Sequence, residues 1–236
     1  MFTFGGIFMS VLSTQELQDW LVKSELDVGD FHLNPTGIFK SFVQRDWFHY
    51  KLMLPTKADI QMHIPSIIHG YESYKREVEN ENYDSLFSSI LHKAILIEAF
   101  LYFYDDIPQE DRFTLFLVTH MRAEYGFDAI DEDFLYQLVE DRPRGFSLNL
   151  PTTHSNRDEL VIYRGHGPNS LDIEESYNWT LNLDIAKWFA SRFRFQANGT
   201  LYQAKIKTAD VVAYISDLEE EEVIVLPSQL YDIVKL

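Results

Sequence analysis

The chain has 236 residues, of which 46% are hydrophobic and 15% aromatic, so it can bury a core and does not have the composition of a disordered protein. Its formal net charge of −17 works against sequence-independent binding to nucleic-acid phosphates and favours a basic partner protein. The absence of cysteine excludes disulfides, thiolate metal sites and a cysteine nucleophile.

No stretch reaches the roughly 18 consecutive apolar residues that a membrane-spanning helix needs. The first dozen residues are apolar but lack the basic region and cleavage pattern of a secretion signal. We therefore expect a soluble, cytoplasmic protein that makes no membrane contact.

Helical patterns dominate residues 1–140. Ser13 to Glu16 has the form of a capping box and predicts a helix start. Apolar spacing predicts four further helices, over Ser66–Glu79, Ser85–Tyr104, Asp111–Tyr125 and Asp131–Glu140. Between the first helix and Pro65 the sequence shows no clear period, and residues 141–159 predict an irregular connector.

Short strands replace helices after residue 160. Five strands are expected, over Leu160–Arg164, Tyr177–Leu181, Thr200–Lys207, Asp210–Ser216 and Glu222–Leu226. One helix is expected among them, over Asp184–Phe193. The predicted fold class is α+β, with a mainly helical domain over 1–150 and a strand-rich core over 151–236.

Four consecutive glutamates, Glu219 to Glu222, lead directly into the apolar segment Val223–Leu226. If the strand begins within this run, Glu220 and Glu222 share one face of it, while Glu221 points to the other. Paired carboxylates at a strand entrance suit the stabilisation of a developing positive charge. The alternative is a solvated turn before a strand.

Three segments in the C-terminal third occur in a recognisable order. They are Val161–Gly165, with an arginine ending an apolar strand; Tyr177–Ala190, a strand entering a helix; and Asp210–Tyr214 followed by Glu220–Ile224. In this order they resemble the mono-ADP-ribosyltransferase family of the Arg–Ser–Glu type, found in bacterial toxins and phage proteins. The resemblance covers about residues 160–230.

The resemblance implies a split-sheet domain with an NAD cleft between two small sheets. Arg164 matches the arginine that holds the NAD phosphates and ribose, a task suited to a planar, permanently charged fork. Gly165 would let the nicotinamide amide approach the backbone. Glu222 matches the catalytic glutamate, which stabilises the oxocarbenium-like ribose as nicotinamide leaves. Glu220 matches the upstream carboxylate, which aligns or deprotonates the acceptor.

The sequence departs from the family pattern at one position. Asn178 stands where the family has serine, with Ser176 two residues earlier; an asparagine amide can donate to Glu222 as a serine hydroxyl would. Thr180 matches the family threonine. Phe195, or Phe193 beside it, is the candidate for stacking on nicotinamide. No metal is expected, because the eight histidines show no HExxH spacing.

The expected function is transfer of ADP-ribose from NAD to a protein or nucleic acid, with release of nicotinamide, in an intracellular toxin or a phage or defence effector. The helical part would recognise the target or bind a neutralising antitoxin or inhibitor. Two alternatives remain: an NAD glycohydrolase that uses water, and an inactive fold kept as a binding module. A nucleic-acid acceptor would be guided by a local basic patch, formed by Arg192, Arg194, Lys205 and Lys207.

Overall fold

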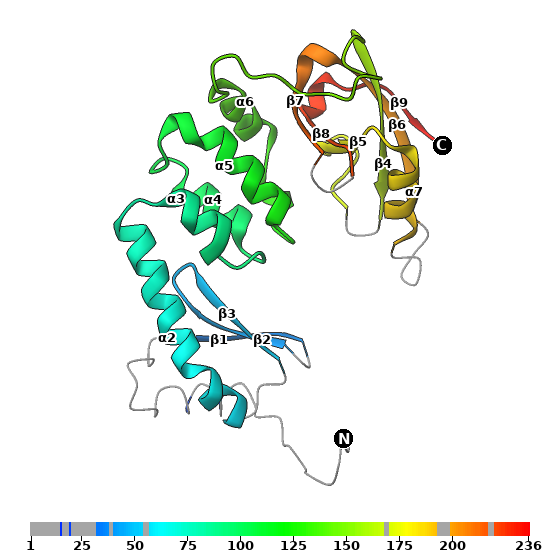
Figure 1. The fold of residues 1–236 in the computed structure, drawn as a ribbon. Coiled ribbons are helices and arrows are strands. Elements are labelled where there is room, and N and C mark those ends of the chain that lie inside the picture. Colours follow the sequence, from blue (N-terminus) through cyan, green and yellow to red (C-terminus); the bar gives the residue numbers. More distant parts are fainter. Residues whose placement is uncertain are drawn as a thin grey trace. The chain divides into compact units, whose positions relative to one another are not determined.

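The computed structural model describes residues 15, 19, 32–37, 40–53, 57–167, 170–192, 199–216 and 220–236. The chain divides into two compact units (Figure 1). Unit 1 comprises residues 1–107 and 118–125, and unit 2 comprises residues 108–117 and 126–236. This division differs from the expected one at residue 150, because residues 126–150 belong to unit 2. The helix expected from Ser13 lies outside the described residues apart from positions 15 and 19.

Unit 1 contains a three-stranded antiparallel sheet that the sequence pattern did not reveal. Its strands β1 (His32–Gly37), β2 (Lys40–Arg45) and β3 (Phe48–Met53) are ordered β1-β2-β3. A two-residue turn joins β2 to β3, with Asp46 at a φ of 51°. Aspartate tolerates this left-handed backbone better than most residues, so the hairpin forms without the glycine that usually signals one. The expected mainly helical domain therefore also contains a small sheet, in the stretch where the sequence shows no clear period.

Helix α2 (Lys57–Glu79) begins before the expected start at Ser66 and runs through Pro65. A proline inside a helix removes one hydrogen bond and costs about 3 kcal/mol. Ile64, Ile67 and Tyr71 are buried on both sides of the proline. Their burial offsets the cost, since each such side chain contributes about 1.5–3 kcal/mol.

The long helix expected over Ser85–Tyr104 is interrupted. A short helix α3 (Tyr83–Ser85) leads into a π-helical turn η1 (Leu86–Ile90), and α4 spans Leu96–Phe103. Arg122 donates to the carbonyl of Phe87 and, at 3.5 Å, to that of Leu91, so the carbonyls at the end of η1 are satisfied by a side chain. The sequence shows apolar residues on more than one side of a single predicted helix. In the structure these residues belong to two separate helices, η1 and α4.

Two further helices agree closely with the sequence pattern. Helix α5 (Gln109–Arg122) contributes residues to both units. After a 3-10 turn η2 (Phe127–Ala129), helix α6 (Glu132–Glu140) begins at Asp131. The Asp131 carboxylate accepts a hydrogen bond of 2.8 Å from the backbone N–H of Phe134, which caps the helix.

The sheet of unit 2 has six antiparallel strands in the order β7-β8-β5-β4-β6-β9. The strands are β4 (Glu159–His166), β5 (Asn178–Thr180), β6 (Thr200–Lys207), β7 (Val211–Ile215), β8 (Glu222–Val225) and β9 (Tyr231–Lys235). Short 3-10 turns η3 (Thr208–Asp210) and η4 (Pro227–Gln229) precede β7 and β9. The five expected strands are confirmed and β9 is additional. The mixed α+β class is confirmed as well.

A close approach of helix to sheet fixes helix α7 (Leu183–Ser191) in unit 2. A Cβ atom added to Gly165 on β4 would lie 2.2 Å from the Ala186 carbonyl oxygen and 2.4 Å from the Ala190 nitrogen. Only glycine allows β4 to lie this near to the helix backbone. The hydrophobic core of the sheet comes from its strands and from Leu181, which directly follows β5. Its buried residues are Leu160, Ile162, Trp179, Leu181, Ala204, Ile206, Val211, Val223 and Val225.

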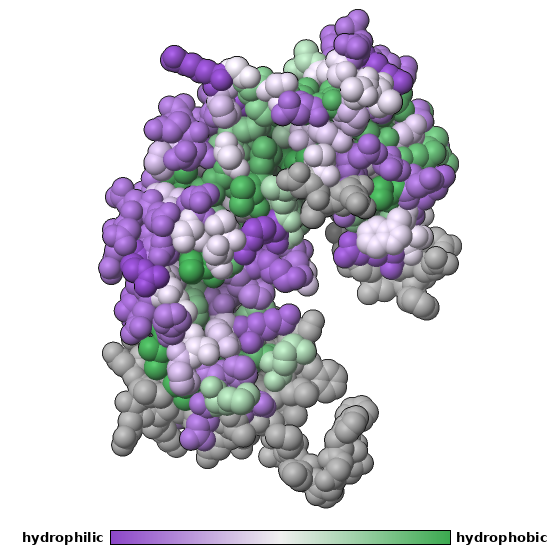
Figure 2. All heavy atoms as spheres, viewed as in Figure 1, coloured by the Kyte–Doolittle hydropathy of each residue, from purple (hydrophilic) through white to green (hydrophobic). Residues whose placement is uncertain are grey.

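Hydrophilic residues, purple in Figure 2, cover much of the drawn face, with hydrophobic residues in green between them. Among the described residues, no helix has the length and apolar character needed to cross a bilayer.

Candidate functional site

The six-stranded sheet has a narrow join at its centre. Strands β4 and β5 are paired through a single register position, Tyr163 with Thr180, whereas β4 and β6 are paired over eight residues from Glu159 to His166. The sheet therefore consists of two three-stranded halves, β7-β8-β5 and β4-β6-β9, that meet at one rung.

Arg164 follows this rung and bridges the two halves. Its Nη1 atom donates to the backbone carbonyl of Asn178 and, at 2.5 Å, to the Asn178 side-chain oxygen. Burial lowers the pKa of Arg164 from its usual value to about 10, while the nearby Tyr177 and Glu222 raise it. The guanidinium thus remains charged at neutral pH, within electrostatic reach of Glu222.

Asn178 has a different partner from the one expected. The family resemblance would have its side chain donate to Glu222, yet its oxygen accepts from Arg164. The register explains the difference: Asn178 lies opposite Ile224, and Thr180 lies opposite Glu222. Tyr163, Thr180 and Glu222 therefore form one row across three neighbouring strands.

The charge of Glu222 acts on Glu220, but the two residues do not lie on one face of the same strand as expected. Strand β8 begins at Glu222, and the residue before it, Glu221, has a left-handed backbone with a φ of 47°. Burial raises the pKa of Glu220, the neighbouring Glu222 raises it further, and Arg192 lowers it. The charge of Glu221 acts instead on Tyr214 in β7. Burial raises the pKa of the Tyr214 phenol, and Glu221 raises it further.

The Thr180 hydroxyl holds the segment that carries these carboxylates. It donates to the backbone carbonyl of Glu220 at 2.5 Å and accepts from the N–H of Asn182 at 3.0 Å. Asn182 in turn caps α7, accepting from the N–H groups of Asp184 and Ile185. One threonine therefore links the acidic segment, β5 and the start of α7.

Tyr177 is a site residue that the sequence did not single out. Its side chain is 1% exposed and its hydroxyl donates to the Phe127 carbonyl at 3.2 Å. Burial raises the pKa of this phenol well above its usual value; Glu222 adds to the rise and Arg164 opposes it. The contact with residue 127 joins segments 50 positions apart, which no local pattern reveals.

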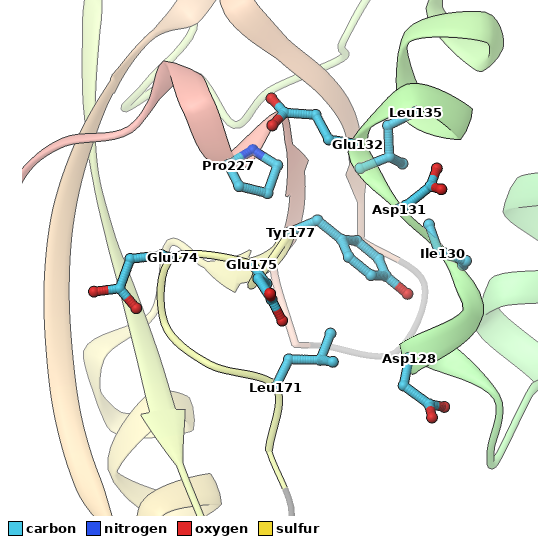
Figure 3. Close-up of a pocket in the computed structure, with 10 residues that line it drawn as sticks. All are labelled: Asp128, Ile130, Asp131, Glu132, Leu135, Leu171, Glu174, Glu175, Tyr177 and Pro227. Carbon is cyan, nitrogen blue, oxygen red and sulfur yellow. The ribbon is translucent and has the colours of Figure 1, made fainter.

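Tyr177 also lines a pocket of about 330 Å³ in unit 2. Figure 3 shows its ring extending from β5 toward the segment that carries Asp128 and Ile130. Five carboxylate residues line the pocket: Asp128, Asp131, Glu132, Glu174 and Glu175. Two of them have structural partners, because Asp131 caps α6 and Glu132 accepts from the backbone N–H of Ser228 at 3.0 Å.

The remaining sequence candidates have different outcomes. Gly165 faces the backbone of α7, which gives it a packing role. Phe195, Phe193 and Arg194 lie outside the described residues. Lys205 of the suggested basic patch is paired with Asp232 at 3.0 Å and Glu159 at 3.6 Å. No group of three or more histidine, aspartate or glutamate residues that could hold a metal occurs among the residues described.

Comparison with protein-family models, curated proteins and solved structures gave no match. Function is therefore inferred from the geometry of the site. The structure brings together five of the sequence candidates, Arg164, Asn178, Thr180, Glu220 and Glu222, and adds Tyr177.

Proposed function

We propose that this chain transfers ADP-ribose from NAD to a macromolecular acceptor and releases nicotinamide. The observation that carries the proposal is the convergence of Arg164 and Glu222 where the two halves of the sheet meet. An arginine on one half and a carboxylate on the other is the arrangement that the family resemblance implies.

The polar atoms of Arg164 fit an anionic substrate. Its Nε atom is buried and has no hydrogen-bond partner among the described residues. A buried donor without a partner is costly, and a phosphate oxygen would satisfy it. In this proposal Arg164 holds NAD through that nitrogen, while Nη1 remains bound to Asn178 and keeps the side chain in place.

Glu222 would supply the electrostatic part of catalysis. The glycosidic bond between C1′ of the ribose and the nicotinamide nitrogen breaks, and its electron pair leaves with nicotinamide. Positive charge then develops on the ribose. A carboxylate already fixed by pairing in β8 stabilises this charge without reorganising during the reaction.

Glu220 would serve as the general base. As the acceptor nucleophile bonds to C1′, it loses a proton, which Glu220 takes up. Burial and Glu222 raise the pKa of Glu220 from its usual value, which makes its carboxylate a better proton acceptor. The tie from Thr180 keeps it beside Glu222.

The proposal is tested by incubating the protein with NAD labelled in the adenine ring and a cell lysate, while nicotinamide release is measured separately. Glu222→Gln should lower nicotinamide release by about 100-fold or more, the usual cost of losing a group that stabilises transition-state charge. Glu221→Gln is the matched control, since Glu221 lies one residue away and acts on β7. Equal activity of the parent and the Glu222→Gln variant would refute the site assignment.

The same assay separates the alternatives. Label that protease removes indicates a protein acceptor, and label that nuclease removes indicates a nucleic acid. Nicotinamide release with no label on any macromolecule indicates a glycohydrolase. Absence of nicotinamide release indicates a binding module and overturns the enzymatic proposal.

A further inference from the structure

The edge strand β7 contains a β-bulge where it pairs with β8. The register on either side of the bulge is given by two pairs, Val211 with Val225 and Ala213 with Ile224. Two steps along β7 therefore correspond to one step along β8, and Val212 is the extra residue. Every pair beyond the bulge is shifted by one residue relative to a regular ladder.

This bulge decides which residue of β7 faces Glu222. With the bulge present, Ile215 lies opposite Glu222. If β7 paired regularly from Val211 onward, Tyr214 would take that place, and a shift of one residue turns side chains to the other face of a sheet. The bulge also sets the length of the segment that joins β7 to Glu220. The placement of both carboxylates thus depends on the bulge.

Arg142, which lies shortly after α6, binds the bulge directly. Its Nη2 atom donates to the carbonyl oxygens of Val211 and Val212, each at 2.6 Å. Consecutive carbonyls of a regular strand point to opposite sides, so their convergence on one nitrogen depends on the bulge. Both valines are buried, and loss of the guanidinium would take this donor from two buried carbonyls, which is costly.

Aromatic side chains hold the Arg142 guanidinium in place. Its central carbon lies 5.1 Å from the centre of the Phe146 ring and 5.9 Å from that of Phe113. The two rings pack edge to face, with their centres 4.8 Å apart. Phe113 is buried and belongs to α5. The donor to the bulge is therefore positioned by packing that does not involve β7.

We propose that Arg142 is a positioning residue for Glu222. It fixes the bulge at Val212, and the bulge fixes the register that brings Glu222 to the site. Arg142 acts through strand β7 and makes no contact with the substrate. Its effect on catalysis rests on the proposed function, whereas its control of the register does not.

The register is measured by backbone NOEs in solution, without NAD. Glu222 of the parent should show NOEs to Ile215. Arg142→Met removes the donors and keeps an unbranched side chain beside the two rings, so these NOEs should weaken and NOEs from Glu222 to Tyr214 should replace them. Arg144→Met makes the same change of charge at an exposed position two residues away and should keep the parent pattern.

Deletion of Val212 makes the test specific to the bulge. Without this residue, the pairs on either side form one regular register in which Ile215 still faces Glu222. The deletion variant should therefore keep the parent NOEs, and adding Arg142→Met to it should not change them. If Arg142→Met alone does not fold, the double variant should still fold with the parent NOEs. Loss of those NOEs, or of folding, in the double variant would show a general packing role for Arg142 and overturn the inference.

Nicotinamide release connects the register to the reaction. Arg142→Met should lower kcat by at least about tenfold, because misplacing a group by about 1 Å can cost about 100-fold. The KM for NAD should change little, since Arg164 lies on β4 in the other half of the sheet. Deleting Val212 from Arg142→Met should restore kcat.

The two proposals fail in different ways. A parent that releases no nicotinamide counts against the proposed function, and the NOEs then decide the role of Arg142. Parent-like NOEs in Arg142→Met, or an unchanged kcat when the parent is active, would overturn the role of Arg142 and leave the proposed function standing.

Discussion

At the scale of single residues, the site depends on side chains that serve structure and chemistry together. Arg164 joins the two halves of the sheet through Asn178 and has a buried Nε with no hydrogen-bond partner among the described residues. Thr180 completes the turn into α7 and secures the backbone of Glu220. Substitutions at these positions therefore change stability as well as activity, and a test has to measure both.

Replacing Thr180 with valine keeps the shape of the side chain and removes the hydroxyl. Thr180 is 6% exposed, so the Glu220 carbonyl and the Asn182 N–H would lose a buried partner, at a cost of about 1–3 kcal/mol in the free energy of unfolding. Urea unfolding measures this loss. Acceptor labelling should fall more than nicotinamide release, because the freed segment carries Glu220.

Thr180→Ser is the control for that experiment, since it retains the hydroxyl and should retain most of the stability and the labelling. If the valine variant were as stable as the parent, the two hydrogen bonds of Thr180 would not be holding the acidic segment.

At the scale of elements, α7 packs closely against β4 in unit 2. The helix presents Ala186 and Ala190 to the sheet, and Gly165 lets the two backbones approach. The helix start is tied to β5 by Asn182 and Thr180. The position of α7, and with it that of Arg192, thus depends on the close approach of Gly165 and Gly199 and on the Asn182 cap.

A methyl group at Gly165 should separate this helix from the sheet. Its carbon would lie 2.2 Å and 2.4 Å from backbone atoms of α7, which cannot rotate away as a side chain can. We expect Gly165→Ala to destabilise the protein by about 1–3 kcal/mol, as overpacking of a core does. The thermal unfolding midpoint measures this loss.

Gly145→Ala is the comparison for that variant, because a Cβ atom there meets nothing within 4 Å and only its φ of 79° opposes the change. A smaller loss at position 145 than at 165 supports the steric explanation. Equal losses would contradict it.

The sequence predicted those elements whose signal is local. Strand β6 has the expected bounds, because its apolar residues alternate over its full length. Helix α6 was recognisable from its capping Asp131. The break between η1 and α4 was not, because it is stabilised by Arg122, more than 30 residues away. Strands β1–β3 were missed because their turn at Asp46 has no glycine.

The residues of the candidate site also divide into those that the sequence indicates and those that depend on distant contacts. The order of the segments was enough to select Arg164, Asn178, Thr180, Glu220 and Glu222. The partner of Asn178 depends on strand register, which becomes visible only once β5 is paired with β8. Tyr177 depends on a contact with η2, which lies outside the segment of resemblance.

At the scale of the whole molecule, one titrating side chain in each unit responds to acid in the opposite direction from the other. In unit 1, burial and the neighbouring His92 lower the pKa of His49 to about 4 from 6.5. In unit 2, burial and Glu222 raise the pKa of Glu220. Compared with the unfolded chain, the folded protein therefore binds a proton less readily at His49 and more readily at Glu220.

The stability from His49 is fully present above pH 6.5 and is lost progressively as the pH falls toward 4, because the unfolded chain binds the proton first. We expect unit 1 to lose on the order of 1 kcal/mol between pH 7.5 and pH 5, because His49 is partly exposed and solvent screens part of the effect. Hydrogen exchange followed by mass spectrometry measures this loss unit by unit. Unit 2 should lose less over the same range.

His49→Phe supplies the control, since it removes the titrating group and keeps a ring beside Phe42. Its unit 1 should show a weaker dependence on pH than that of the parent. An unchanged dependence would mean that other groups control the acid response.

The left-handed backbone at Glu221 has one more consequence. This backbone conformation sets the spacing between Glu220 and Glu222. It occurs one residue before Glu222, the first paired residue of β8. The acidic run is therefore constrained in length more than in charge. Deleting one glutamate leaves three in the run, counting the first residue of β8, but shifts a different side chain into the turn. Exchanging Glu221 for asparagine removes a charge but introduces a residue that readily adopts this left-handed backbone.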